Sequence, residues 1–201
     1  MPEEKPTLLL LTCCGPCATA CVERTAFDYD VTVFYYNPNI TDSEEYYLRK
    51  ENLEKFLRLF NEEYKDRTLV HYLEGRYEPE KYLERTAMLK DEPEGGRRCE
   101  ECFRLRYEEA ARVAKARNAD YWTSTMSVSP HKNYDLLTKN LPQSRTPVTC
   151  RLILRRRTVL AEVWNFQRSM VCIGSDSADA TMQGTLMPKG YEGDKEKDNY
   201  E

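Results

Sequence analysis

The chain alternates between two patterns of apolar and polar positions from residue 7 to about residue 137. Short runs of apolar, β-branched and aromatic residues, such as TLLLLT and DVTVFYY, are typical of strands that are covered on both faces. Longer stretches with apolar residues three and four positions apart are typical of amphipathic helices, and Thr41 with Glu44 is expected to cap the second of these. The predicted strands are residues 7–12, 30–36, 67–75 and 120–125; the predicted helices are residues 20–26, 44–60, 79–90, 99–118 and a further one that follows the loop starting at residue 127.

Strands that alternate with helices predict one open, mostly parallel α/β sheet with helices on both faces. We expect residues 1–137 to form this domain, residues 138–188 to be an atypical segment with poor binary patterning, and residues 189–201 to be a disordered charged tail. Ligands of such sheets bind beyond the carboxyl ends of the strands. The loops at residues 13–17 and 125–133 each follow a strand, so both are expected at that edge.

Length and composition limit the class of protein. The 201 residues suffice for one domain with a core, and the net charge of −4, from 30 basic and 34 acidic residues, neither requires nor excludes a nucleic-acid partner. No apolar stretch approaches the length of a membrane span, and the opening MPEEKP does not resemble a signal peptide. We therefore expect a cytoplasmic protein with reduced cysteines and no membrane partner, in which isolated cysteines such as Cys21 are small apolar core residues.

Clustered cysteines are the strongest chemical signal in the chain. Cys13, Cys14 and Cys17 directly follow the first predicted strand. Cys99 and Cys102 open a predicted helix, on which positions i and i+3 share one face. If the fold brings two pairs together, the four thiolates suit either zinc or an iron–sulfur cluster. The sequence therefore predicts metal or redox chemistry at these cysteines.

Polar residues in the segment SPHKN form a second candidate site, because this segment follows the last predicted strand. His131 could act as an acid or base and Lys132 could bind a phosphate, although an ordinary polar turn before a helix explains the segment as well. Basic residues that fit either an anion-binding edge or a solvated helix face are Arg97, Arg98, Arg104 and Arg106.

Four long segments occur in an order that is characteristic of one family. They are LLLLTCCGPC, VTVFYYNPNI, DEPEGGRRCEECFRLRYEEAA and TSTMSVSPHKN, and together they extend from residue 7 to about residue 137. In these segments the chain resembles the QueH family of epoxyqueuosine reductases. The resemblance implies a Rossmann-like α/β fold of the nucleotide-α-hydrolase type. It also implies an oxidoreductase that removes the epoxide oxygen of epoxyqueuosine in tRNA, in the last step of queuosine biosynthesis and without cobalamin.

The resemblance also implies roles for individual residues. Cys13, Cys14, Cys99 and Cys102 would hold a [4Fe–4S] cluster as its four ligands, and Cys17 would be placed to ligate a second, adjacent iron. The partners implied are tRNA carrying epoxyqueuosine and an external electron donor, since no flavin or dinucleotide motif is visible. His131 and Lys132 are expected near the substrate because of their place at the ligand-binding edge.

Two other readings stay open on the residues alone. The same four cysteines could close a structural zinc site in a non-catalytic protein. An ATP-dependent tRNA-modifying enzyme on a related fold is less favoured, because CCGPC has a single glycine and a proline without a backbone N–H to bind phosphate.

The resemblance ends after about residue 137. The family continues with segments like DFKKKDG and GLYRQ and with a cysteine pair, CGC, that is thought to be redox-active, and the printed chain has none of them. A shifted reading frame combines the third base of each codon with the first two bases of the next codon. With suitable codon choices, this frame encodes DFKKKDGFSRSVELSKEYGLYRQRFCGC from Leu152 to Ala180. We therefore hypothesise a frameshift between about Leu137 and Leu152, which leaves the catalytic residues of the printed chain unknown.

The nucleotide sequence tests this hypothesis directly. We expect the shifted frame across codons 152–180 to encode the three family segments, because the printed residues are compatible with all three in order and at natural spacing. The measurement is sequencing of the gene on both strands. A gene whose shifted frame encodes none of these segments would show that the printed residues are the genuine ones.

Overall fold

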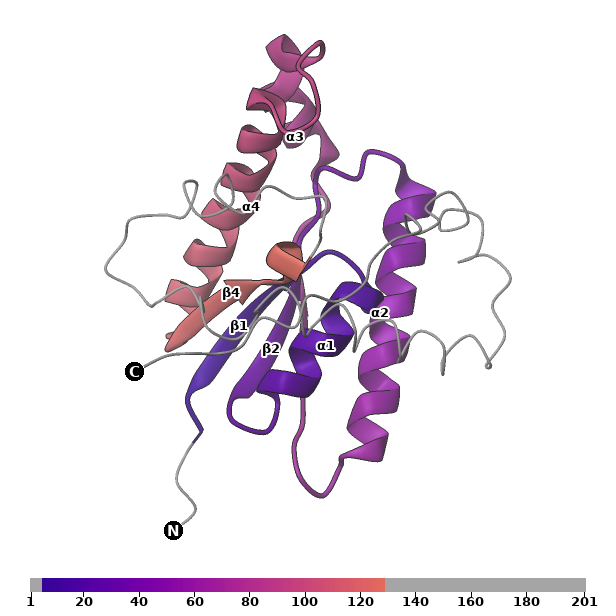
Figure 1. Ribbon diagram of the computed structural model, residues 1–201, viewed down its shortest axis with the longest axis vertical. Helices are drawn as coiled ribbons and strands as arrows, with labels where there is room; N and C mark the ends of the chain where they lie inside the picture. Colours follow the sequence, from indigo (N-terminus) through magenta and orange to yellow (C-terminus); the bar gives the residue numbers. More distant parts are fainter. Residues whose placement is uncertain (1–4, 129–201) are drawn as a thin grey trace, which may run out of the picture. The chain divides into compact units, whose positions relative to one another are not determined.

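The structure is a computed structural model that describes residues 5–128, and Figure 1 shows how their elements are arranged. The described elements form a four-stranded sheet with the order β3-β2-β1-β4. The predicted helix after residue 127, the atypical segment and the charged tail lie outside the described residues. In chain order, the elements are β1 (Thr7–Thr12), α1 (Gly15–Thr25), β2 (Asp30–Tyr35), α2 (Ser43–Glu63), β3 (His71–Glu74), α3 (Pro79–Thr86), the 3₁₀ turn η1 (Ala87–Leu89), α4 (Arg97–Ala116), β4 (Tyr121–Ser124) and the 3₁₀ turn η2 (Thr125–Val128).

Strand β1 lies in the interior of the sheet and pairs in parallel with β2 on one side and with β4 on the other. In this register Leu10 stands opposite Val33 of β2 and opposite Thr123 of β4. The residues from Leu8 to Leu11 are at most 1% exposed, as expected of a strand covered on both faces. The apolar run that predicted a buried strand is therefore confirmed.

Helices cover both faces of the sheet (Figure 1). Helix α1 packs on β1 and on α2, whereas α4 packs on β1 and β4. Because successive side chains of a strand point to opposite faces, Leu9 and Leu11 face α4 while Leu8 and Leu10 face the other side. The buried cluster on the α4 side consists of Leu9, Leu11, Phe34, Tyr36, Phe103, Tyr107, Ala110, Val113, Ala114, Trp122 and Met126. The predicted fold class, an open parallel α/β sheet with a Rossmann-like strand order, is confirmed.

The strand order reverses direction beside β1. The chain proceeds from β1 outward to β2 and β3, and then returns to place β4 on the other side of β1. Such a reversal is a topological switch point, where the loops that leave two neighbouring strands diverge and open a crevice for ligands. A ligand is therefore expected beside the residues that follow β1 and β4.

The third strand is shorter than the predicted range 67–75, and a side chain is the reason. Asn61 of α2 accepts a hydrogen bond from the backbone N–H of Val70 at 2.8 Å and donates one to the carbonyl of Val70 at 2.9 Å. Both backbone groups of Val70 are thus engaged outside the strand ladder, so β3 begins at His71. The segment before it, which contains the exposed Leu69, runs as a connection from α2.

The start of α2 also differs from the prediction. Asp42, and not Thr41, is the N-cap, and its Oδ1 atom accepts hydrogen bonds from the backbone N–H groups of Glu44 at 2.8 Å and Glu45 at 3.3 Å. A carboxylate serves here in place of the hydroxyl of a capping box because it also complements the positive end of the helix dipole.

Replacement of the cap residue tests this correction. Asp42→Ala should lower the free energy of unfolding by about 0.5–2 kcal/mol, because two N–H groups of the first turn lose their acceptor. Asp42→Asn should retain most of the stability, since an amide oxygen can accept the same bonds. The measurement is urea unfolding followed by circular dichroism. Thr41→Ala is the control, and a cost for Thr41→Ala equal to that of Asp42→Ala would restore the original assignment.

Candidate metal centre

The carboxyl end of β1 delivers the first cysteine group. Thr12 is the last residue of the strand, and Cys13 and Cys14 follow it before α1 begins at Gly15. The predicted loop over residues 13–17 is therefore wrong at its end, because Cys17 already belongs to the first turn of the helix. A proline in that turn explains the early start, since its missing N–H would have no partner there in any case.

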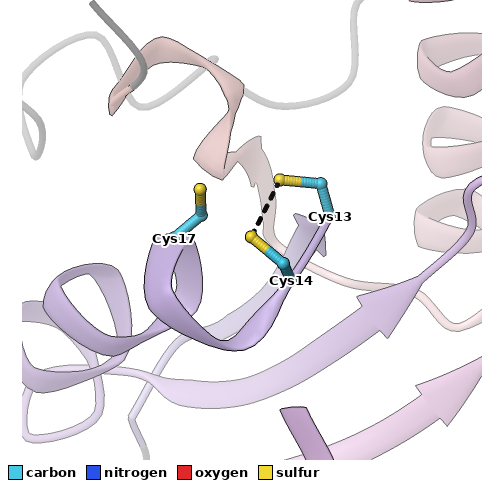
Figure 2. A group of neighbouring side chains, drawn as sticks. All are labelled: Cys13, Cys14 and Cys17. Carbon is cyan, nitrogen blue, oxygen red and sulfur yellow. Dashed lines mark hydrogen bonds between the residues drawn. The ribbon is translucent and has the colours of Figure 1, made fainter. Parts of the chain in front are cut away.

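Three thiols meet at this point, as Figure 2 shows. The Sγ atoms of Cys13, Cys14 and Cys17 all lie within 4.8 Å of one another, and those of Cys13 and Cys14 are 3.6 Å apart. Cys13 is buried, and the other two are partly buried. The change from strand to helix brings these thiols together, because an extended segment and a helical turn project their side chains to the same side of the bend.

The strand on the other side of the switch point contributes to the same place. The Oγ1 atom of Thr125, the first residue after β4, lies 4.0 Å from the Sγ atom of Cys13. Thr125 is fully buried, as is Met126 next to it. The loop from residue 125 was predicted at this edge, but Thr125 was not predicted to have a role, because a threonine after a strand carries no chemical signature of its own.

Crowding raises the pKa of the Cys14 and Cys17 thiols when no cation is present. The hydrogen bond with Cys13 and the burial of the side chain raise the pKa of Cys14 to about 12. The pKa of Cys17 is also raised, first by its hydrogen bonds with Cys13 and Cys14 and then by burial. A second or third negative charge in so small a space is unfavourable without a counter-charge. A bound metal ion would supply that charge and remove the protons.

The donor set fits a thiophilic metal. Soft thiolate ligands select zinc, copper(I) or iron–sulfur clusters. In a tetrahedral site with metal–sulfur bonds of about 2.3 Å, two sulfurs are roughly 3.8 Å apart. The separation between Cys13 and Cys14 is close to this value, so the three thiols can approach a single ion with little rearrangement. An iron–sulfur cluster binds each thiolate to a different iron and requires them to spread farther apart.

The second cysteine pair lies on α4. This helix begins at Arg97, so Cys99 and Cys102 stand in its first turns, as predicted. Cys99 packs against the buried cluster that contains Leu11 and Met126, and its Sγ atom accepts a hydrogen bond from the N–H of Gly95 at 3.3 Å. Neither cysteine belongs to the thiol group at β1, which comprises three residues within the part of the chain that the structure describes.

A buried arginine lies behind the thiol group, and sequence reasoning missed its position. Arg106 of α4 is 2% exposed, although it was expected on either a solvated face or an anion-binding edge. Its Nη2 atom donates to the Oδ1 atom of Asn37 at 2.7 Å, and the Nδ2 atom of Asn37 donates to the carbonyl of Thr12 at 3.1 Å. The contacts of Arg106 with the segments after β2 and β4 are tertiary, so no local pattern reveals them.

His131 and Lys132 lie outside the described residues. Within residues 5–128, none of the helices has both the length and the apolar character needed to span a bilayer.

Fold and site together define an α/β protein with a group of thiols at the switch point of its sheet, suited to a thiophilic metal. A sequence model of the family described as epoxyqueuosine reductase QueH matches residues 8–153 of this chain. The chain therefore belongs to the QueH family.

Individual relatives agree with this membership. The epoxyqueuosine reductase QueH of Staphylococcus epidermidis is 38% identical over 136 residues, which are 67% of this chain and 56% of that relative. The one of Streptococcus pyogenes is 37% identical over 129 residues, which are 64% of this chain and 50% of the relative. The one of Thermotoga maritima is 31% identical over 134 residues, which are 65% of this chain and 64% of the relative. The chain spans about half the length of the first two relatives.

Two cysteines on the same helix give a matched test of the thiol group. Loss of a residue that only supports a metal ligand weakens metal binding about 10–100-fold. Cys17→Ala removes a ligand itself and should therefore weaken cobalt(II) binding by more than that. Cys21→Ala should bind cobalt(II) as the unaltered chain does, since the buried Cys21 lies one turn farther along α1 and outside the group. The measurement is titration of the thiolate-to-cobalt absorption under reducing conditions. Equal loss in both variants would mean that the group is not a defined metal site.

Proposed function

We propose that this protein is an iron–sulfur oxidoreductase that reduces the epoxide of epoxyqueuosine in tRNA and gives queuosine, without cobalamin. Membership of the QueH family supports the reaction, because the similar proteins of the family carry the name epoxyqueuosine reductase. The single observation that carries the metal part of the proposal is the group formed by Cys13, Cys14 and Cys17 at the switch point of the sheet.

The proposed reaction fixes what the site must provide. Both carbon–oxygen bonds of the epoxide break, a carbon–carbon double bond forms, and the oxygen leaves as water after uptake of two electrons and two protons. When bound, the cluster and an adjacent iron would supply single electrons and a Lewis acid for the leaving oxygen. The electrons come from an external donor. The chain's own residues bind the metal, exclude water from its buried side and hold the substrate at the strand ends.

The proposed cluster ligands are Cys13, Cys14, Cys99 and Cys102, with Cys17 at the adjacent iron. Helix α4 precedes the parallel strand β4 and therefore runs back toward the amino ends of the strands, so its first turn starts at their carboxyl edge. Cys99 packs against the buried apolar side chains that include Leu11 and Met126, and this packing supports the placement of α4 at that edge. Thiols from two elements at one edge can adjust toward a shared metal more easily than thiols at opposite ends of a sheet.

The proposed substrate contacts and the catalytic pair belong to the rest of the chain. We propose that His131 and Lys132 contact the tRNA substrate, because they follow β4 in the sequence and ligands of such sheets bind beyond the carboxyl ends of the strands. We also keep the proposal of a frameshift in the segment 138–188. It is supported by the family match, which ends at residue 153, next to Leu152, where the shifted frame begins to encode the family segments. Metal binding should then survive in the printed chain, whereas turnover needs the missing cysteine pair.

A structural zinc site is the second candidate, and one observation favours it. The spacing of the thiols at β1, all within 4.8 Å, suits a single tetrahedral ion without the spreading that a cluster requires. A zinc site of this kind would be closed by a fourth ligand and would leave no open position for substrate.

Metal analysis under exclusion of oxygen separates the two candidates. We expect about four irons and four acid-labile sulfides per chain, the content of a Cys₄-ligated cluster, with additional iron if the adjacent site is filled. Replacement of both Cys99 and Cys102 by alanine should abolish the sulfide content, because two of the four ligands are lost. Zinc without sulfide in the unaltered chain would establish the structural site instead.

The activity measurement follows the same logic. Iron-loaded chain with the reading frame restored should convert epoxyqueuosine to queuosine in tRNA with a chemical reductant, as measured by mass spectrometry of the nucleosides. The printed chain, equally loaded, should show little or no conversion because it lacks the cysteine pair. Absence of conversion by the restored, iron-loaded chain would contradict the proposed reaction.

A further inference from the structure

Arg106 is a charged side chain enclosed by the protein at the centre of the described fold. Its guanidinium donates to three acceptors: the Oδ1 atom of Asn37 at 2.7 Å, the carbonyl of Tyr36 at 3.4 Å and the Sδ atom of Met126 at 2.9 Å. The first two acceptors lie directly after β2, and the third lies directly after β4. One side chain of α4 therefore joins the ends of two strands that are not neighbours in the sheet.

All three acceptors are electrically neutral. Among the ion pairs of residues 5–128, none pairs Arg106 with a carboxylate. Burial of an arginine without a counter-charge is costly, and hydrogen bonds to neutral groups offset only part of that cost. Two exposed arginines of the same helix illustrate the contrast, since Arg104 pairs with Glu101 and Arg112 pairs with Glu109.

Two short paths lead from this charge to the thiol group. Asn37 accepts from Arg106 and donates at 3.1 Å to the carbonyl of Thr12, the residue before Cys13. Met126 accepts from Arg106 and follows Thr125, whose hydroxyl lies 4.0 Å from the sulfur of Cys13. The guanidinium thus stands behind the place where three thiols would become anionic on binding a metal.

We propose that Arg106 is the buried counter-charge of the metal centre, and that its positive charge favours the more negative, reduced state of the bound metal. Arg106 acts as a positioning residue, because it contacts Asn37 and Met126, which lead to Thr12 and Thr125 beside Cys13, and does not contact the cysteines themselves. This inference rests on the proposed metal site. Arg49 of α2 also lies near the thiols, but its guanidinium is paired with the carboxylate of Glu45 and so brings less net charge.

The charge of Arg106 and its hydrogen bonds can be separated by substitution. Arg106→Lys keeps a cation but loses the planar fork, whereas Arg106→Met loses both at similar volume. Asn37→Asp leaves Arg106 in place and gives it a carboxylate partner, which cancels the charge and keeps an acceptor for the Nη2 atom, although the donor to the carbonyl of Thr12 is lost. Arg104→Met is the matched control, because it removes an exposed arginine from the same helix and leaves Glu101 its other partner, Arg85.

The experiment is a dye-mediated redox titration of the full chain after anaerobic reconstitution with iron and sulfide. At a fixed potential we expect Arg106→Met and Asn37→Asp each to lower the ratio of reduced to oxidised metal about tenfold, which corresponds to about 59 mV for one electron. Arg104→Met should match the unaltered chain, and Arg106→Lys should lie closer to it than to Arg106→Met. Circular dichroism and iron content are measured on every sample, so that the potential is compared between folded, loaded proteins.

The possible outcomes distinguish this inference from the function on which it rests. An unchanged potential in iron-loaded Asn37→Asp overturns the proposal that Arg106 is a counter-charge. A shift in Arg106→Lys as large as that in Arg106→Met also overturns it, because the effect would then come from the fork geometry of the guanidinium. Asn37→Asp decides the matter even if Arg106→Met fails to fold, because it retains the arginine. An unaltered chain that binds no iron overturns the metal site itself, and the inference with it.

Discussion

The pairing of β1 between two parallel neighbours is the constraint on which the rest of the structure depends. From Leu8 to Leu11 this strand is paired on both sides, and the side chains of these residues are buried on both faces of the sheet. A slip by one residue would exchange the two faces and misplace a whole set of packed side chains. The register therefore fixes where the strand ends, and the residue that emerges there is Cys13. The position of the thiol group is a consequence of packing that involves no thiol.

Much of this arrangement can be predicted from local pattern, and the failures have identifiable causes. The four strands and the edge at which the cysteines lie follow from short apolar runs and from the rules of parallel sheets. The start of β3 could not be predicted, because the side chain of Asn61 takes both backbone groups of Val70. The start of α1 was missed because a proline was read as part of a loop, although the first turn of a helix tolerates it.

The site shows the same division between local and tertiary information. The spacing of the cysteines was enough to identify them as candidate ligands, because their chemistry is specific to the residue type. The spacing of the arginines was not enough, because a cation on a helix can be solvated or buried. Only the packing of α4 against Tyr36 and Met126 distinguishes Arg106 from Arg104 two positions earlier. Residues that act through charge at a distance are for this reason the hardest to find from sequence.

Electrostatics connects the two halves of the site. Burial and crowding raise the pKa of the Cys14 and Cys17 thiols, and a buried guanidinium loses its hydration, so each feature is unfavourable by itself. Together they become reasonable if the thiols are deprotonated on a metal, because the excess negative charge of the thiolates then lies near the buried cation. The polar path through Asn37 and Thr12 keeps the two charges apart, so the cation can stabilise the centre without competing with the metal for its ligands. On this proposal metal binding and the folding of this edge are parts of one equilibrium, because the thiols and the buried cation are held by the ends of the same sheet.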